Sequence, residues 1–406
     1  MVSSKVPTLN EFYDALETVR AIAVKTPIME SHWLSELTGQ PIWFKCENLQ
    51  RAGSFKIRGA YNRIARLTAE QRNKGVVAAS AGNHAQGVAL AAQILGIKAT
   101  IFMPEGATLP KYQATLGYGA DVIFSGKTID EALMAASAFS DETGAVFIHP
   151  FDHEHIVAGQ GTIGLEILAQ NPDVKTVVVC TGGGGLLAGT ALAIKSLRPD
   201  IKVIGVQAEM AAAYPPSLAA GSPQMLPKMS TMADGIAVGK PGDVPFKIIQ
   251  QHVDEIRTVS EASLARALLL TLERSKLQVE AGGIAAVAAI LDDPDSFEGP
   301  VVASLSGGNI DPLLLSRVLR TGLATSGRFL MVQVRLSDQP GSLAKLLACV
   351  AELGTNIIQT SHTRMNPALA ISEVDVELEL ETRGFEHRDQ ILAQIVANGF
   401  EIVTYY

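Results

Sequence analysis

The chain has 406 residues, of which 47% are hydrophobic and 18% are charged, a composition typical of two or three compact units and not of a disordered chain. Its formal net charge of −8 excludes a diffuse basic surface for nucleic acid or anionic lipid. No apolar run approaches the roughly 18 residues that span a bilayer, and the N-terminus has no apolar signal core. The only cysteines are Cys46, Cys180 and Cys349, which favours a reducing compartment. We therefore expect a soluble cytoplasmic protein without nucleic-acid or membrane partners.

Short β-rich runs alternate with longer alanine-rich segments from about residue 45 to residue 310. The runs are continuously apolar, which is typical of parallel strands buried on both faces. The segment 85–95 has the small side chains that let a helix pack closely on a sheet. This alternation predicts an α/β domain whose ligands gather at the carboxyl ends of its strands. The predicted strands are residues 75–79, 99–103, 120–124, 176–179, 202–206 and 300–304.

The pattern changes near residues 325–328. Residues 329–334 predict a strand, and a turn at 337–342 leads into a segment whose leucines and valines follow helical spacing. Residues 374–380 alternate apolar with acidic side chains, which predicts a strand with one solvated face. A helix at 389–397 and a strand at 401–405 complete a βαββαβ order. We expect a separate α+β module of about 75 residues.

Lys56 is the first candidate for chemistry, because it follows a Gly-Ser turn and precedes a predicted helix. An amine at a helix entrance can form a Schiff base where desolvation or nearby positive charge lowers its proton affinity. A lone lysine is more often an ordinary surface residue. The segments that follow three of the predicted strands change that balance.

Each of these three segments lies at the end of a strand. Residues 80–87 offer amides and polar side chains to an anion at a helix N-terminus, although Ser80 or Asn83 could instead cap that helix. The four glycines at 182–185 let backbone amides turn around a phosphate, because no Cβ obstructs its approach. Residues 304–309 close the last core strand with Ser-Leu-Ser-Gly-Gly-Asn.

The glycine loop also raises a different class of function, a nucleotide-binding oxidoreductase. Glu209 ends the next strand, about where a dinucleotide site holds its ribose-binding carboxylate. The glycine spacing does not match that fingerprint cleanly, and a dinucleotide site gives no role to Lys56 or to the loop at Asn83. A further class is a non-catalytic amino-acid sensor built from the C-terminal module.

Taken in order, the four segments resemble the fold-type II pyridoxal-phosphate family, and most closely the threonine dehydratases, also called threonine ammonia-lyases. The resemblance implies a fold similar to the β subunit of tryptophan synthase, with two subdomains that carry parallel-rich sheets. It implies a catalytic domain over residues 1–322, with a smaller subdomain over about 53–150. The tail, residues 328–406, resembles an ACT regulatory domain.

The resemblance also implies roles for individual residues. Lys56 would form the Schiff base with pyridoxal 5′-phosphate and act as general base. Substrate contacts for the carboxylate would be Ser80, Asn83 and His84. Further cofactor contacts would be Phe55 beside the ring, Asn83 at the ring hydroxyl, Ser306 opposite the ring nitrogen, and Gly182, Gly183, Gly184, Gly185 and Leu186 at the phosphate.

The reaction implied is the dehydration and deamination of L-threonine to 2-oxobutyrate and ammonia, and of L-serine to pyruvate. A neutral hydroxyl at Ser306 cannot hold a pyridinium as a carboxylate would, so expulsion of a β-substituent competes better than transamination. Hydroxyaspartate dehydratase and serine racemase are the alternatives within the family. Racemisation ranks below elimination, because the racemase uses a serine where this chain has Ala81.

Two acidic residues, Glu209 and Glu280, each allow two interpretations of their role. Relatives carry a divalent cation near the position of Glu209; here Glu209 and the Ala213 carbonyl would form an incomplete shell, because Pro215 replaces the second acidic ligand. Glu280 matches an acidic position near the active site, and it could equally cap the helix that starts there.

The ACT-like tail implies amino-acid sensing, usually at an interface between two such modules, and hence a homodimer or homotetramer. A carboxylate or amine could bind at Asp338, Gln339, Pro340 and Gly341 and the helix start at Ser342. Isoleucine or valine is the effector that analogy suggests, which would fit isoleucine biosynthesis. A purely structural dimerisation domain is the alternative.

Overall fold

The computed structural model describes residues 5–364 and 369–406, and the chain divides into two compact units that meet between Pro312 and Leu313. The sequence placed this boundary some residues later, at about 322–328. The helix α14 (Pro312–Thr325) lies almost wholly in the second unit. Each unit is described by itself below.

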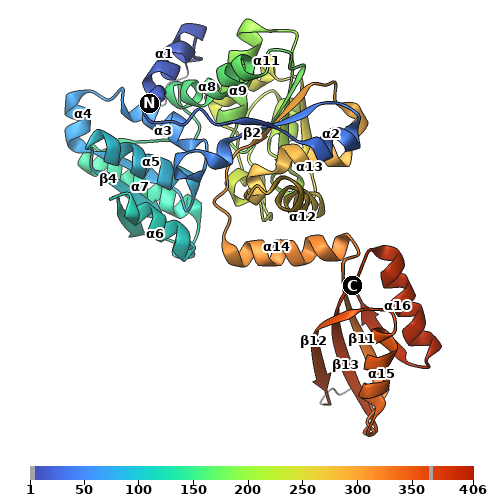
Figure 1. Ribbon diagram of the computed structural model, residues 1–406. Coiled ribbons are helices and arrows are strands. Elements are labelled where there is room, and N and C mark those ends of the chain that lie inside the picture. The colour runs from blue at the N-terminus through green and yellow to red at the C-terminus, as the bar shows by residue number, and fades with distance from the viewer. Residues whose placement is uncertain (1–4, 365–368) are drawn as a thin grey trace. The chain divides into compact units, whose positions relative to one another are not determined.

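The larger sheet of the first unit has six strands in the order β1-β2-β10-β7-β8-β9, and β1 is its one antiparallel member. Helices cover both of its faces, with α8, α9 and α11 on one and α12 and α13 on the other (Figure 1). The strands are β1 (Ile28–Glu30), β2 (Ile42–Cys46), β7 (Thr176–Cys180), β8 (Lys202–Ala208), β9 (Glu255–Val259) and β10 (Val301–Leu305). The helices are α1 (Leu9–Arg20), α2 (His32–Thr38), α8 (Glu154–Gln170), α9 (Gly185–Leu197), α10 (Tyr214–Ala220), α11 (Asp243–His252), α12 (Glu261–Leu270) and α13 (Ala285–Asp292).

The smaller sheet is parallel throughout, in the order β5-β4-β3-β6. Its helices include α3 and α5, which pack against each other, and α3 also packs on α8 of the larger subdomain. The strands are β3 (Val76–Ala79), β4 (Ala99–Met103), β5 (Asp121–Phe124) and β6 (Val146–Phe147). The helices are α3 (Lys56–Ile64), α4 (Ala69–Lys74), α5 (Asn83–Leu95), α6 (Leu109–Gly117) and α7 (Ile129–Thr143).

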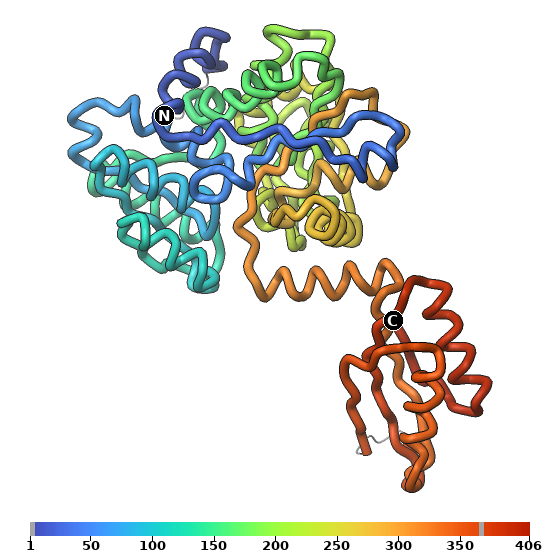
Figure 2. The backbone as a smooth tube through the Cα atoms, in the orientation of Figure 1, coloured from blue at the N-terminus to red at the C-terminus, as the bar shows by residue number. Residues whose placement is uncertain are grey.

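The path of the backbone brings segments that are far apart in the sequence to the junction of the two subdomains. The blue N-terminal segment with β2 lies beside the orange strand β10, so the larger sheet is built from both ends of the first unit (Figure 2). The smaller subdomain is inserted between them. The segments that the sequence analysis singled out can therefore meet where the two subdomains adjoin.

The second unit has the βαββαβ order that the sequence predicts, with an antiparallel sheet in the order β12-β13-β11-β14. The alternation on β13 is confirmed for its apolar side chains, but Asp375 is buried, because Arg335 and Gln333 of β11 bond its carboxylate. The elements are β11 (Phe329–Ser337), α15 (Ser342–Ala351), β12 (Asn356–Thr363), β13 (Glu373–Glu381), α16 (Phe385–Ala397) and β14 (Glu401–Tyr405).

All six predicted strands of the α/β region are present, and β3, β4, β7 and β10 are buried along their whole length. The prediction of burial on both faces is wrong for β5, which is largely exposed because it lies at the edge of the smaller sheet. The three cysteines are free and buried. None of the described helices combines the length and the apolarity that crossing a bilayer requires.

Candidate active site

Lys56 begins α3 directly after Phe55 and is half-buried. Its Nζ donates a hydrogen bond to the Pro150 carbonyl at 3.0 Å and lies 5.2 Å from the centre of the Phe55 ring. Burial lowers the pKa of the Lys56 amine to about 8, and the nearby Glu280 carboxyl opposes that shift. More of the amine is therefore neutral near physiological pH than in an ordinary lysine, which favours its use as a nucleophile and general base.

The loop at residues 80–83 connects β3 to α5 and leaves the first turn of that helix without a side-chain cap. Ser80 Oγ accepts from the Gly82 amide at 3.1 Å, which closes a turn within the loop instead. The Asn83 amide nitrogen donates to Glu280 Oε1 at 2.6 Å, and Asn83 Oδ1 accepts from Asn309 at 2.9 Å. The capping alternative is therefore wrong for both Ser80 and Asn83, and the helix amides at this loop are available to an anion.

Glu280 belongs to this site and makes no side-chain cap on the short helix that follows it. Its side chain is buried beside Asn83 and lies near Lys56. Burial raises the pKa of Glu280 to about 7, with a further contribution from Asp234, while Lys111, Asn83 and Lys56 oppose the shift. Of the two interpretations that the sequence left open for Glu280, the structure supports the one at the active site.

His84 is buried, and its Nε2 lies 2.7 Å from the Ile148 carbonyl. Burial, followed by the charge of Lys56, lowers the pKa of His84 to about 3, so its imidazole is neutral. Ser80 and Asn83 lie partly exposed on the loop, whereas one ring nitrogen of His84 already has a backbone partner. The role of His84 in binding the substrate carboxylate stays a prediction.

The glycine loop joins β7 to α9, which starts at Gly185 and has no side-chain cap. A Cβ on Gly183 would collide with the Phe151 ring, and one on Gly184 would collide with the Tyr214 hydroxyl. Gly184 also has a φ of +97°, which favours glycine. Gly183 itself is fixed by a hydrogen bond from the Tyr214 hydroxyl to its carbonyl at 3.2 Å. The loop is a shaped, uncapped helix entrance of the kind that binds phosphate, and not a flexible linker.

Two neighbouring residues link this loop to Lys56. The Pro150 carbonyl accepts from the lysine amine, and the next residue, Phe151, packs against Gly183 and Gly185. Pro150 and Phe151 lie in the loop after β6, and no motif in the sequence marked them. The amine and the glycine loop are thus brought together in one site.

Ser306 follows β10 and is buried. Its carbonyl accepts from the Phe55 amide at 3.2 Å, which ties it to the start of α3. Burial raises the pKa of the Cys180 thiol, and hydrogen bonds from neighbouring groups, the Ser306 and Ser304 side chains among them, oppose that shift. From the sequence, Cys180 served only as evidence for a reducing compartment. The structure shows that it is also a neighbour of Ser306.

The incomplete cation shell predicted at Glu209 and Ala213 has weak geometric support. The Glu209 side chain is exposed, and the Ala213 carbonyl accepts from both the amide and the hydroxyl of Ser217, at 3.3 and 2.6 Å. Pro215, which offers no side-chain oxygen to a cation, occupies the first turn of α10.

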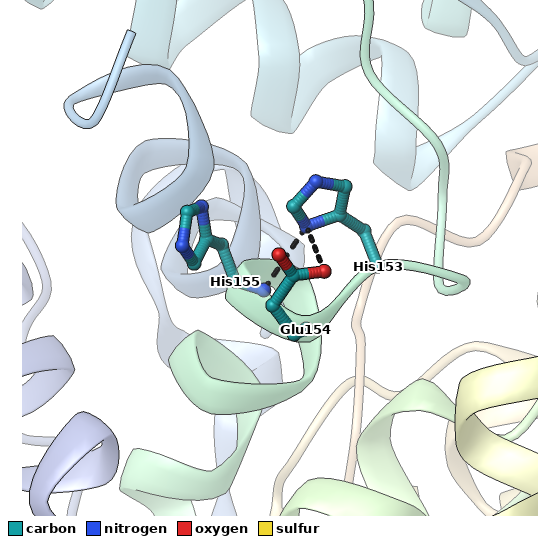
Figure 3. Close-up of side chains that lie close together, drawn as sticks. All are labelled: His153, Glu154 and His155. Atoms are coloured by element: carbon teal, nitrogen blue, oxygen red, sulfur yellow. Dashed lines mark hydrogen bonds and ion pairs between the residues drawn. The ribbon is translucent and has the colours of Figure 1, made fainter. Parts of the chain in front are cut away.

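Within residues 5–364 and 369–406, one other group has the side-chain types and spacing to hold a metal ion, His153, Glu154 and His155 (Figure 3). Its His153 Nδ1 accepts from the His155 amide at 3.1 Å and so caps α8. Burial, with Arg63 adding to it, lowers the pKa of His153 to about 4. A helix N-terminus and a nearby guanidinium both repel a cation, so we interpret this group as a helix cap.

The second unit contains a cavity of about 240 Å³ at the turn that the sequence singled out. Asp338 pairs there with Arg364, at 3.1 and 3.2 Å for the two hydrogen bonds from the guanidinium. Arg364 was not found from the sequence. The lining residues are Leu336, Ser337, Asp338, Gln339, Pro340, Ser342, Leu343, His362, Arg364 and Val374.

The residues of the first unit fit pyridoxal phosphate. A desolvated lysine amine suits an aldehyde, an uncapped helix start behind four glycines suits a phosphate, and a buried hydroxyl suits a neutral ring nitrogen. A dinucleotide site would use Glu209, which follows β8, but would leave the desolvated Lys56 amine and the Asn83–Glu280 contact without a role.

Comparison with known proteins agrees with this geometry. Residues 19–307 match the family described as pyridoxal-phosphate dependent enzyme. The chain is 48% identical to the L-threonine ammonia-lyase of Thermotoga maritima over 395 residues, which covers 97% of this chain and 98% of that protein.

Two solved structures show the same fold. Threonine deaminase isoform 2 from Solanum lycopersicum has a TM-score of 0.73 and 36% identity, covering 79% of this chain and 96% of that one. Maize serine racemase has a TM-score of 0.74 and 34% identity, covering 79% and 99%. The chain therefore belongs to the pyridoxal-phosphate dependent enzymes, in the group that contains the threonine ammonia-lyases.

Proposed function

We propose that this protein is an L-threonine ammonia-lyase, which converts L-threonine to 2-oxobutyrate and ammonia and also accepts L-serine, giving pyruvate. The observation that carries the proposal is the meeting of the desolvated Lys56 amine with the glycine loop through Pro150 and Phe151. The similarity to the ammonia-lyase of Thermotoga maritima over nearly the whole chain supports the choice of substrate.

Bound pyridoxal phosphate supplies the electron sink that stabilises negative charge at the substrate Cα. Lys56 would take the Cα proton on its Nζ, for which a pKa of about 8 is well matched. Gly182, Gly183, Gly184, Gly185 and Leu186 would hold the phosphate, Phe55 would flank the ring, and Asn83 would orient the ring hydroxyl. Ser306 would face the ring nitrogen with a neutral hydroxyl, which favours loss of the β-hydroxyl over transamination.

Serine racemase is an alternative, because a solved serine racemase shares this fold at 34% identity. Racemisation needs an acid on the second face of the substrate, and Ala81 has no proton to give. We therefore expect oxo-acid release from threonine and serine, with little D-serine formed. Assay of oxo-acid release from hydroxyaspartate tests the other dehydratase of this family.

The test of the catalytic role is Lys56→Ala, with Lys228→Ala as a control, since Lys228 is exposed and the structure assigns it no role in the site. We expect the first variant to lose at least roughly 10²–10⁴-fold in kcat and the second to keep its activity. Reduction of the holoenzyme with borohydride, followed by peptide mapping, should place the cofactor on Lys56. Full activity in Lys56→Ala, or labelling of another lysine, would contradict the assignment.

We assign catalysis to the first unit and amino-acid sensing to the second, which we infer to be an ACT-like regulatory domain in a cytoplasmic homodimer or homotetramer. A cavity that contains a carboxylate, a guanidinium and apolar side chains suits an amino acid, whose ammonium, carboxylate and side chain need these partners. Isoleucine and valine are the first effectors to test. Unchanged turnover and unchanged oligomeric state with both would leave the structural dimerisation role instead.

A further inference from the structure

Lys111 and Asp234 form an ion pair that joins the two subdomains beside the active site. Lys111 lies on α6 of the smaller subdomain, and Asp234 begins the short helix η4 (Asp234–Ile236) in the larger one. The sequence singled out neither residue. Lys111 is 14% exposed, whereas Asp234 is 54% exposed, so the pair has one sheltered and one solvated end.

The sheltered end lies against the loop that offers the uncapped helix amides. A Cβ on Gly82 would lie 3.9 Å from Lys111 Nζ and 4.0 Å from its Cδ, so the lysine side chain runs over the backbone of this loop. The charges of both partners also reach the buried site, where Asp234 raises and Lys111 lowers the pKa of Glu280, although burial has the larger effect on that group. Lys111 is therefore a fixed cation at the edge of the site.

The segment around Asp234 is itself well anchored, so it can hold Lys111 in place. A Cβ on Gly182 of the glycine loop would lie 3.0 Å from Ile236 Cα, and one on Gly235 would lie 3.1 Å from Glu280 Oε1. The Met232 amide donates to Glu261 of α12 at 2.9 Å. Asp234 thus extends from a segment packed on both the glycine loop and Glu280.

We propose that Lys111, oriented by Asp234, is a positioning and specificity residue that supplies the positive charge for the substrate carboxylate at the loop of residues 80–83. The loop otherwise offers neutral donors, namely helix amides and the side chains of Ser80 and Asn83, and the adjacent His84 is neutral. A cation held beside neutral donors adds attraction for an anion without the cost of ordering a free lysine side chain. The inference rests on the proposed function, because that assigns the carboxylate to this loop.

The test compares two probes that cannot eliminate water, L-alanine and L-alaninamide, which differ in the carboxylate. Calorimetry with the holoenzyme gives their dissociation constants without need of turnover. In Lys111→Met we expect the dissociation constant of L-alanine to rise about tenfold, as for loss of one charge-assisted contact, while that of L-alaninamide stays within twofold. Lys111→Arg, which keeps the charge, should restore most of the L-alanine affinity.

The matched control is Lys98→Met, which breaks an exposed Lys–Asp pair with Asp121 at 3.1 Å in the same subdomain and should change neither constant. With Lys111→Met, equal losses for both probes would mean a merely structural contact, and no loss for either would mean no role; both results overturn the inference. Higher salt should weaken L-alanine binding more in the wild-type protein than in this variant. Failure of the proposed function would show separately, as wild-type protein that does not turn over threonine.

Discussion

Burial shifts the pKa values of Lys56 and Glu280 toward each other. It lowers the pKa of the lysine to about 8 and raises that of the glutamic acid to about 7, because each charged form loses its hydration. Near neutral pH both groups can therefore exchange protons, in a site where Asn83 connects Glu280 to the loop at residue 80. The two shifts follow from the same cause and make a proton donor and a proton acceptor available within one site.

We predict that Glu280→Gln removes an ionisation near pH 7 from the pH profile of kcat/KM. The raised pKa has a consequence for stability as well. The folded form keeps the proton up to about pH 7, whereas the unfolded chain releases it near the ordinary value of 4.5. The stabilisation is therefore complete below pH 4.5 and is lost as the pH rises through 7. Chemical unfolding between pH 4.5 and 8 should show a smaller decline for the variant, and parallel curves for the two proteins would contradict this.

A second prediction at this scale concerns Gly184. Gly184→Ala places a side chain at a positive φ and against the Tyr214 hydroxyl. Gly39→Ala is the control: it also places a side chain at a positive φ, +69°, but no other atom lies near that side chain. We expect Gly39→Ala to cost about 1–2 kcal/mol and Gly184→Ala to cost a further roughly 1–3 kcal/mol from overpacking. Thermal unfolding measures both. Cofactor absorbance should fall only in Gly184→Ala, and equal behaviour of the two would refute a packed glycine loop.

At the scale of elements, α3 positions Lys56 through a buried ionic network that includes Arg58, two residues further along the helix. Arg58 bonds Glu47 of the segment after β2 at 2.8 Å and Glu166 of α8 at 2.7 Å. Lys45 of β2 also bonds Glu166, at 2.5 Å, and all four side chains are buried. The network fixes the start of α3 against both the larger sheet and α8, so the Lys56 amine extends from a firmly held helix.

We predict that Arg58→Met destabilises the first unit by about 3–5 kcal/mol, because it leaves two buried carboxylates with fewer partners. Arg198→Met is the control, since Arg198 forms an exposed ion pair with Asp200 and such pairs contribute roughly 0–1 kcal/mol. Urea unfolding followed by tryptophan fluorescence provides the measurement. A loss below 1 kcal/mol in Arg58→Met would show that the network does not hold the helix.

At the scale of the whole molecule, the candidate active site and the proposed effector cavity fall in separate compact units. Regulation then requires an effector whose affinity differs between two states of the protein. The Asp338–Arg364 ion pair is exposed, so it contributes little to the free energy of unfolding. A substitution in this pair can therefore test regulation without destabilising the protein.

We predict that Arg364→Met abolishes any change in threonine turnover caused by isoleucine or valine and leaves basal kcat and the melting temperature unchanged. The guanidinium would be the group that binds the effector carboxylate. Arg388→Met is the control, because Arg388 lies on α16 and pairs with Asp389, away from the residues that line the cavity. A response that persists in Arg364→Met would place the effector elsewhere.

Local patterns in the sequence were sufficient to predict the class of fold and the loops that form the candidate site. Continuous apolar runs predicted β3, β7 and β10, because a strand covered on both faces has no polar side to show. The glycines at 182–185 predicted an anion site, because without side chains the backbone amides can turn toward an anion whatever the rest of the fold is. The resemblance then gave roles to Lys56 and Ser306.

Contacts between distant segments were decided only by the tertiary structure. Whether Glu280 caps a helix or lies in the site depended on Asn83, 197 residues away in the chain. No sequence motif marks Pro150, Phe151 or Lys111. They reach the candidate site only because the fold brings the loop after β6, the glycine loop and the inserted smaller subdomain together. Burial of the amine and the carboxyl, and hence their pKa values, is likewise a property of the assembled site, since desolvation requires neighbours that no local pattern specifies.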